Sequence, residues 1–282
     1  MSFRLPTTEE KADYVLNQFN RIAKRYDLAN DTISLGMHRL WKEKAIIALD
    51  VKPGGKYLDV CCGTGDLTLR IAKKIFKTRT SGIVPTLVKS TQDSATNSPS
   101  SNDIISDYLS SNGTVVGLDF SPNMLEIAKV RFDKEKSHLL YPEFMPSVSF
   151  VEGDAQSLPF SDNYFDGAII SFGLRNLTDL DKGLSEMVRV VKSGGNIVNL
   201  DLGRPTNVFF TPIYYFYFRH IVPIIGQLLQ KDVKAYTYLP RSLDTYPAPV
   251  GISKLFQEAG LRNVQYLPLA MESVALHIGA KP

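Results

Sequence analysis

The stretch Lys56-Tyr-Leu-Asp-Val-Cys-Cys-Gly-Thr-Gly-Asp66 decides the fold of this chain. Its apolar first half predicts a buried strand, and the periodic apolar residues after it predict a helix that begins near Leu67. Between them, Gly63 and Gly65 let the backbone turn tightly and approach a ligand that a Cβ would exclude, with Thr64 between the two glycines. The first N–H groups of the helix then point toward whatever binds there. The stretch therefore predicts a ligand site where the strand ends.

A second buried strand ends in an acidic residue. Thr114-Val-Val-Gly-Leu-Asp119 is apolar up to its last position, and Ser121-Pro122 after it is typical of a helix N-cap and first turn. A glycine turn alone also occurs in plain turns and in dinucleotide-binding proteins. A carboxylate at the end of the next strand can accept hydrogen bonds from both hydroxyls of a ribose. Asp119 is therefore the predicted ribose ligand.

Two more predicted strands end in polar groups. After the third strand, Asp154 can accept from an adenine amino group, with Ala155 beside the ring, and the fourth strand ends at Ser171. Four strand ends that carry Gly, Asp, Asp and Ser in that order resemble the S-adenosylmethionine-dependent methyltransferases. The resemblance implies S-adenosyl-L-methionine (SAM) as cofactor. It also implies an α/β fold with a doubly wound, mostly parallel seven-stranded sheet, Rossmann-like, under a helical substrate cap.

Composition and charge narrow the class of protein. The 282 residues are 44% hydrophobic and 22% charged, which is ordinary for one soluble domain with additions. A formal charge of +3 is too near neutral to indicate a nucleic-acid surface, so we expect no nucleic acid partner. The two cysteines, Cys61 and Cys62, are adjacent, which excludes a disulfide framework and a four-cysteine zinc site within this chain. They are interpreted as small apolar fillers, and no metal ligand is assigned.

The sequence shows neither a secretory signal at its N-terminus nor the ~20 uninterrupted apolar residues of a membrane-spanning helix. We expect a cytoplasmic protein, with peripheral membrane contact left open. An organellar location applies if a transit peptide was removed. The sequence does not fix the oligomeric state, and a homodimer stays open.

Three parts of the chain are predicted. Residues 1–50 form an N-terminal helical cap or substrate lid, opened by a capping box at Thr7-Thr8-Glu9-Glu10. Residues 51–202 form the SAM-binding core, in which 77–113 is an inserted, mobile polar loop. Residues 203–282 supply a helical lid segment and the closing strands of the sheet. For the polar and aromatic residues 25–42, the alternative to a lid is a capped helix pair with a solvated face.

The most apolar and aromatic segment spans residues 208–226. It has two interpretations, a helical lid packed over the mouth of the cofactor site or an interfacial element that touches lipid. Packing is the commoner fate of aromatic residues, which favours the lid. Both interpretations suit a greasy substrate.

Five stretches extend the resemblance over nearly the whole chain apart from the polar insertion. The entry segment, residues 25–42, and the stretch Phe-Gly-Leu-Arg-Asn at 172–176 are specific to one family. The five stretches resemble signatures of the ubiquinone/menaquinone C-methyltransferase family and are Phe19–Asp31, Ser34–Lys42, Cys62–Asp66, Gly153–Phe160 and Phe172–Asp179. The resemblance implies methylation of a ring carbon on a prenylated quinol, late in quinone biosynthesis. Residues 216–226 and 275–279 look more like menaquinone-type members, so demethylmenaquinol ranks first. A methoxy-polyprenyl-benzoquinol of ubiquinone biosynthesis and demethylphylloquinol are the alternatives.

The chemistry of such a transfer requires particular side chains. An aromatic carbon becomes nucleophilic when a ring hydroxyl loses its proton, which calls for a base or a cation that stabilises the oxyanion. Arg175 is the predicted stabiliser, acting through water on the proton, and Asn176 is predicted to orient the ring oxygens. Tyr26 either hydrogen-bonds to the same ring or packs in its helix. The alternative role of Arg175 is an ion pair with one of three carboxylates, Asp27, Asp31 or Asp179.

His38 and His277 are the other candidate bases, because imidazole titrates nearest neutral pH, although a polar turn favours a structural role for His38. Asp66 is predicted to cap its helix. Two other classes stay open, an NAD-dependent oxidoreductase and a non-catalytic SAM-binding scaffold. The first lacks the third glycine of its motif in this sequence.

Overall fold

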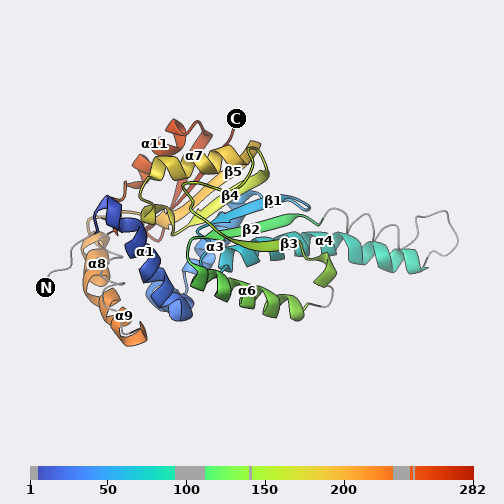
Figure 1. The fold of residues 1–282 in the computed structure, drawn as a ribbon, viewed down its shortest axis with the longest axis horizontal. Helices are drawn as coiled ribbons and strands as arrows, with labels where there is room; N and C mark the ends of the chain where they lie inside the picture. Colours follow the sequence, from blue (N-terminus) through green and yellow to red (C-terminus); the bar gives the residue numbers. More distant parts are fainter. Residues whose placement is uncertain (1–5, 93–111, 140–141, 231–241, 244) are drawn as a thin grey trace.

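A computed structural model describes residues 6–92, 112–139, 142–230, 242–243 and 245–282 (Figure 1). Within them, seven strands form one sheet in the order β3-β2-β1-β4-β5-β7-β6. The strands are β1 Lys56–Val60, β2 Thr114–Asp119, β3 Ser147–Glu152, β4 Phe165–Ser171, β5 Val191–Leu202, β6 Arg262–Leu269 and β7 Val274–Ala280. β7 runs antiparallel to its two neighbours, β5 and β6, and the other four strand pairs are parallel. The predicted doubly wound, mostly parallel seven-stranded sheet is confirmed.

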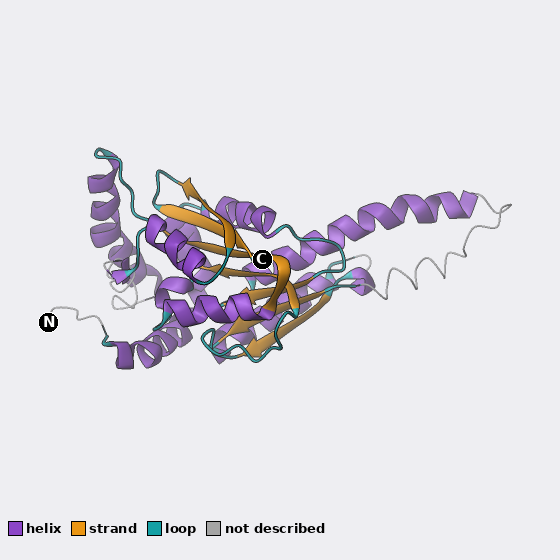
Figure 2. Ribbon diagram, turned by 90° about the horizontal axis from the view of Figure 1, so that it is seen from above, coloured by secondary structure: helices purple, strands orange, loops and turns teal. Residues whose placement is uncertain are grey.

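Helices cover both faces of the sheet (Figure 2). One face carries α3 His38–Leu49, α4 Asp66–Gln92 and α6 Pro122–Ser137, and the other carries α7 Leu180–Val190 and α11 Pro249–Glu258. Side chains along β1 alternate between the two faces, which is why both helix layers are needed. Tyr57 packs with residues of α3 and α4, whereas Leu58 and Val60 pack with residues of α7 and α11. A strand buried on both faces is typical of parallel sheets.

A helical cap lies at one end of the sheet, opposite the end from which α4 projects (Figure 1). Its elements are α1 Thr8–Ile22, a 3-10 turn η1 Ala23–Arg25, α2 Tyr26–Ser34, α8 Phe210–Phe216, a π-helical segment η4 Tyr217–Ile221 and α9 Val222–Gln230. The predicted capping box at Thr7 and Glu10 is present. Ile22 of α1 shares a buried cluster with Tyr214 and Phe218, so the N-terminal helices and the segment after β5 build the cap together. Two further 3-10 turns, η2 Pro142–Phe144 and η3 Leu174–Asn176, lie in connections.

The predicted polar loop 77–113 is wrong over its first part, because α4 continues as a helix to Gln92. The hydroxyls of Thr78 and Thr80 donate to the carbonyls of Lys74 and Phe76 at 2.9 and 3.0 Å. Such bonds one turn back let polar β-branched residues remain in a helix. Residues 93–111 lie outside the described part of the chain, and the prediction of a mobile loop there stays a prediction.

A glycine pair is typical of a helix end, but Gly194 and Gly195 lie inside β5. Helix α7 already ends at Val190, and β5 begins at the next residue. Gly194 has a φ of +82°, and its N–H donates to the Lys281 carbonyl at 2.8 Å. The left-handed residue therefore bends the strand toward the chain end instead of capping a helix.

Candidate active site

A cavity of about 170 Å³ lies at the carboxyl ends of the central strands. Five of the predicted cofactor residues line it, one or two from the turn or end of each strand: Gly63, Asp119, Asp154, Ala155 and Ser171. The strand order reverses at β1: β2 and β3 follow on one side of it in the sheet, and β4 and β5 follow on the other. Such a switch point leaves a crevice at the carboxyl edge, which is where ligands bind in open α/β sheets.

Asp119 ties the glycine turn to the end of β2. One carboxylate oxygen accepts from the Gly63 N–H at 2.8 Å, and the other accepts from the Ser121 N–H at 2.9 Å. Burial raises the pKa of Asp119 to about 6, although the N–H groups of Ser121 and Gly63 oppose that rise. The carboxyl is therefore mainly ionised at neutral pH. Each oxygen keeps a lone pair for a further donor, as a ribose diol requires.

Ser171 provides a direct test of whether this cavity suits a polar ligand. Its hydroxyl is buried and has no hydrogen-bond partner among the described residues. An unsatisfied buried hydroxyl costs about 1–3 kcal/mol, so a ligand that supplies a partner recovers that free energy. Across the cavity, the exposed Asp154 carboxylate accepts from the Gln156 N–H at 2.8 Å. The residues present fit a nucleoside-bearing cofactor.

Thr64 and Gly65 were predicted to bind the cofactor, but they do not belong to the lining of this cavity. The Thr64 hydroxyl donates to Asp27 at 2.7 Å, and Asp27 also pairs with Arg131, which joins α2 to α6. Gly65 has a φ of +74°, and a Cβ there would lie 2.9 Å from the Ala128 Cβ. Both residues pack the glycine turn against the adjoining helices, Thr64 against α2 and Gly65 against α6. Any contact that they make with the cofactor stays a prediction.

A second, apolar cavity of about 340 Å³ adjoins the first. Its walls come from the cap and from the segment after β4, and four residues line both cavities: Phe19, Tyr26, Phe172 and Asn176. The Tyr26 ring packs edge-on against Phe19, with centroids 5.9 Å apart. Tyr26 of α2 therefore packs against α1 and lines both cavities, and its hydrogen bond to the acceptor ring stays a prediction. The predicted cap residues 25–42 contribute to this wall as well.

Arg175 lines the apolar cavity and is paired with a residue that the sequence did not single out. Its guanidinium Nη1 donates to one carboxylate oxygen of Asp201, and its backbone N–H donates to the other at 3.2 Å. Only 7% and 2% of the two side chains are exposed. The alternative of an ion pair was right in kind and wrong in partner. The three carboxylates proposed as partners are engaged elsewhere, Asp27 with Arg131, Asp31 with Arg39, and Asp179 as the N-cap of α7.

Comparison with known proteins identifies the family. A model of the ubiE/COQ5 methyltransferase family matches residues 7–281. The chain belongs to this family. It is 36% identical to a demethylmenaquinone methyltransferase of Desulfitobacterium hafniense (strain Y51), over 97% of this chain and 92% of that protein. It is 35% identical to a demethylmenaquinone methyltransferase of Bacillus cytotoxicus, over 97% of this chain and 98% of that protein.

Solved structures share the fold of this ubiE/COQ5 family member at low sequence identity. A SAM-dependent methyltransferase from Thermotoga maritima is 17% identical, with a TM-score of 0.54 over 94% of this chain and 99% of that chain. One from Aquifex aeolicus is 15% identical, with a TM-score of 0.51 over 84% of this chain and 88% of that chain. The enzyme is a methyltransferase with S-adenosylmethionine as its cofactor, as the order of its strand ends predicted.

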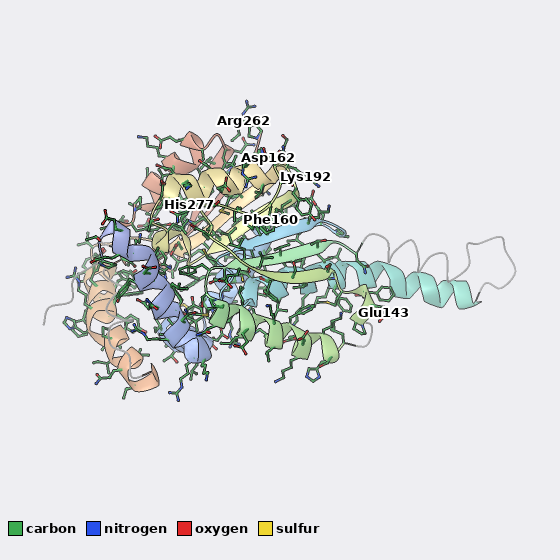
Figure 3. All side chains as sticks on the ribbon, viewed as in Figure 1. Glu143, Phe160, Asp162, Lys192, Arg262 and His277 are labelled. Atoms are coloured by element: carbon green, nitrogen blue, oxygen red, sulfur yellow. The ribbon has the colours of Figure 1, made fainter. Side chains whose placement is uncertain are left out.

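The two histidines occupy different parts of this methyltransferase. His38 lines the apolar cavity, where its Nε2 lies 2.7 Å from Asp31, and burial lowers its pKa. His277, labelled in Figure 3, packs against the rings of Phe256 and Tyr266, and its Nε2 lies 2.9 Å from the Pro249 carbonyl. It lines neither cavity as described, so the structure gives no support to His277 as the base.

Sequence reasoning missed two residues of the apolar cavity region. Asp201 is the second-last residue of β5, so the rule that polar strand ends gather at one edge could have identified it. Tyr214 comes from α8, and its position over the site depends on how the cap packs. No local pattern in the sequence carries that information.

Proposed function

We propose that this enzyme transfers a methyl group to a ring carbon of a prenylated quinol, with demethylmenaquinol as the acceptor. The observation that carries the proposal is the apolar cavity beside the cofactor cavity, with the buried Arg175 in its wall. Relatives named demethylmenaquinone methyltransferase over nearly their whole length favour this acceptor. A benzoquinol of ubiquinone biosynthesis remains the second candidate, because the family name includes both branches.

Five residues would hold the cofactor: Gly63, Asp119, Asp154, Ala155 and Ser171. In this assignment Asp119 accepts from the ribose, Asp154 accepts from the adenine amino group, and Ser171 gains the partner that it lacks. When bound, S-adenosylmethionine supplies an electrophilic methyl group on a sulfonium. Two cap residues, Phe19 and Tyr26, line both cavities and would limit the access of water to the reacting carbon.

The acceptor ring must lose a hydroxyl proton near Arg175. A guanidinium keeps its charge at all working pH values and presents several N–H donors in one plane. Asp201 occupies one edge of that plane and fixes its direction. Donors held in place beside the ring oxygen lower the free energy of the anion without reorganising during the reaction. In this proposal Asn176, whose Nδ2 donates to the Phe172 carbonyl at 3.2 Å, orients a second ring oxygen.

The quinol tail gives the exposed side of α8 a role. Tyr214 and Phe218 pack inward, whereas Phe209 and Phe216 are 86% and 60% exposed. No helix in the described ranges is both long and apolar enough to cross a membrane. We therefore propose peripheral contact, in which this aromatic side rests on the lipid surface that holds the tail.

Sedimentation with lipid vesicles tests this contact. Phe209→Ser with Phe216→Ser is expected to reduce vesicle binding, whereas Val250→Ser, an exposed apolar site on α11, should not. Equal binding of both variants would contradict the membrane role. A homodimer through this face would instead appear as a mass change on dilution.

Methyl transfer from labelled cofactor tests the function itself. The protein is incubated anaerobically with reduced demethylnaphthoquinols, benzoquinols and simple phenols, and the methylated products are identified. Selective C-methylation of the naphthoquinol is expected. Methylation of the benzoquinol alone would move the enzyme to the ubiquinone branch, and methylation of neither quinol would refute the proposal.

A further inference from the structure

Tyr214 of α8 is a buried tyrosine in the wall of the apolar cavity. It is 4% exposed, and its ring packs against Phe218 and Tyr215 with centroids 4.5 and 5.4 Å away. The ring is thus held firmly by the cap. Its hydroxyl oxygen, in contrast, is buried and has no hydrogen-bond partner in the described parts of the chain.

The hydroxyl of the neighbouring Tyr217, unlike that of Tyr214, has a hydrogen-bond partner among the residues that the structure describes. Tyr217 also lines the apolar cavity, and its hydroxyl donates to the Ile33 carbonyl at 2.9 Å. A phenylalanine at position 214 would pack equally well and avoid burying an unsatisfied hydroxyl, which is normally destabilising. A bound ligand that accepts this hydrogen bond would explain why the residue is tyrosine and not phenylalanine.

The surroundings of the hydroxyl determine which partner it suits. Burial raises the pKa of Tyr214, with Arg175 and Asp201 close enough for their opposite charges to act on it in opposite directions. The hydroxyl keeps its proton and is a donor. It lies near the same guanidinium that the proposed mechanism places beside the acceptor oxygen.

We propose that the Tyr214 hydroxyl donates a hydrogen bond to a ring oxygen of the acceptor bound beside Arg175. The inference rests on the proposed function and adds a substrate-contacting residue to it. An oxygen that becomes anionic accepts a stronger bond than a neutral one, so this donor favours the ionised quinol. It also selects rings that carry an oxygen at this position, because a ring without it leaves the hydroxyl unpaired.

Tyr214→Phe tests the contact, with Tyr215→Phe as the matched control. Tyr215 lies on the same helix, but its side chain is not part of the lining of the apolar cavity. Trp41, the one tryptophan of the chain, lines this cavity, so its fluorescence reports quinol binding without any need for turnover. We expect Tyr214→Phe to bind a short-tailed demethylnaphthoquinol about tenfold more weakly, the scale of one lost hydrogen bond to a charged or strongly polar group. Tyr215→Phe should stay within about twofold of the wild type.

The melting temperature of the ligand-free protein separates this role from a structural one. Loss of an unsatisfied hydroxyl should leave the melting temperature of Tyr214→Phe unchanged or higher. A lower melting temperature together with unchanged quinol affinity would show that the hydroxyl serves the fold and would overturn the proposal.

A cycle with two monohydroxy analogues, each lacking one ring oxygen, locates the contact. For the analogue without the contacted oxygen, the wild type and Tyr214→Phe should bind alike, whereas the other analogue should keep the difference. Equal affinities of the two proteins for the quinol and both analogues would overturn the inference. If the wild type binds the quinol without methylating it, the proposed function fails, and the binding data still decide the role of Tyr214.

Discussion

Removing Arg175 alone should destabilise the protein, which would obscure any effect on catalysis. A test of its catalytic role therefore removes its ion-pair partner, Asp201, as well. Arg175→Met leaves the Asp201 carboxylate 2% exposed and without its cation. Breaking one half of a buried ion pair costs about 3–5 kcal/mol, because the remaining charge stays desolvated. At about 2–4 °C per kcal/mol for a protein of this size, the melting temperature should fall by about 6–20 °C.

Asp201→Asn should have a cost of the same order, since it leaves the guanidinium buried. The double variant Arg175→Met/Asp201→Asn removes both charges, and the asparagine oxygen can still accept from the backbone N–H of residue 175. We expect it to recover at least half of the summed loss, as coupled residues do. Its methyl transfer should nevertheless remain about a hundredfold or more below the wild type, the scale of one lost oxyanion donor.

Thermal unfolding and transfer of a labelled methyl group to demethylmenaquinol measure the two effects separately. Wild-type stability of Arg175→Met would refute the energetic importance of the pair. Wild-type turnover of the double variant would remove Arg175 from the mechanism. A stable but inactive double variant is the result that supports both, with cofactor affinity as the control for an intact first cavity.

Three further predictions concern other residues. Because burial raises the pKa of Asp119 to about 6, its carboxylate gains a proton as the pH falls through that value, so cofactor affinity measured by calorimetry should drop below about pH 6 in the wild type. Asp119→Asn should bind more weakly and lose that pH dependence, and an unchanged affinity would contradict the ribose assignment. Gly65→Ala should lower the free energy of unfolding, measured in urea, by about 2–4 kcal/mol, because the new Cβ is forced against α6 at a strained φ. Gly63→Ala has room for its Cβ and should lose only about 1–2 kcal/mol. Equal losses of the two variants would count against this packing argument. His277→Phe should keep its turnover within about twofold despite some loss of stability, and a hundredfold loss would restore it as a candidate base.

The sequence predicted the cofactor half of the site because that half is encoded locally. Each strand ends where its apolar run ends, and the polar residue at that point faces the carboxyl edge once the strands are parallel. Gly63, Asp119 and Ser171 could therefore be assigned to one place without knowledge of any long-range contact. The same local rules failed where one pattern has two structural meanings, as at Gly194, which bends a strand although it is also typical of a helix end.

The partner of Arg175 could not be found by choosing among nearby carboxylates in the sequence. Asp27 and Asp179 were plausible by composition, but Asp27 pairs with Arg131 of α6 and Asp179 caps the N-terminus of α7. The pairing with Asp201 follows from the register of β4 and β5, which sets the segment after β4 beside the end of β5. Register is a property of the sheet, so it became visible only with the fold.

The acceptor half of the site depends on a different kind of contact. Lys11 of α1 donates to the carbonyls of Arg175 and Leu177 at 3.2 and 2.6 Å, which fastens the first helix of the chain to the turn that carries the guanidinium. Tyr214 reaches the same cavity from α8, across the cap from α1. These helices contribute few of the cofactor residues. Substitutions on them can therefore change the fit to the acceptor and leave the binding of the nucleoside by the strand ends unchanged. Acceptor preference within this fold should therefore vary with the cap, and residues of α1 and α8 are where a change of quinol ring would be encoded.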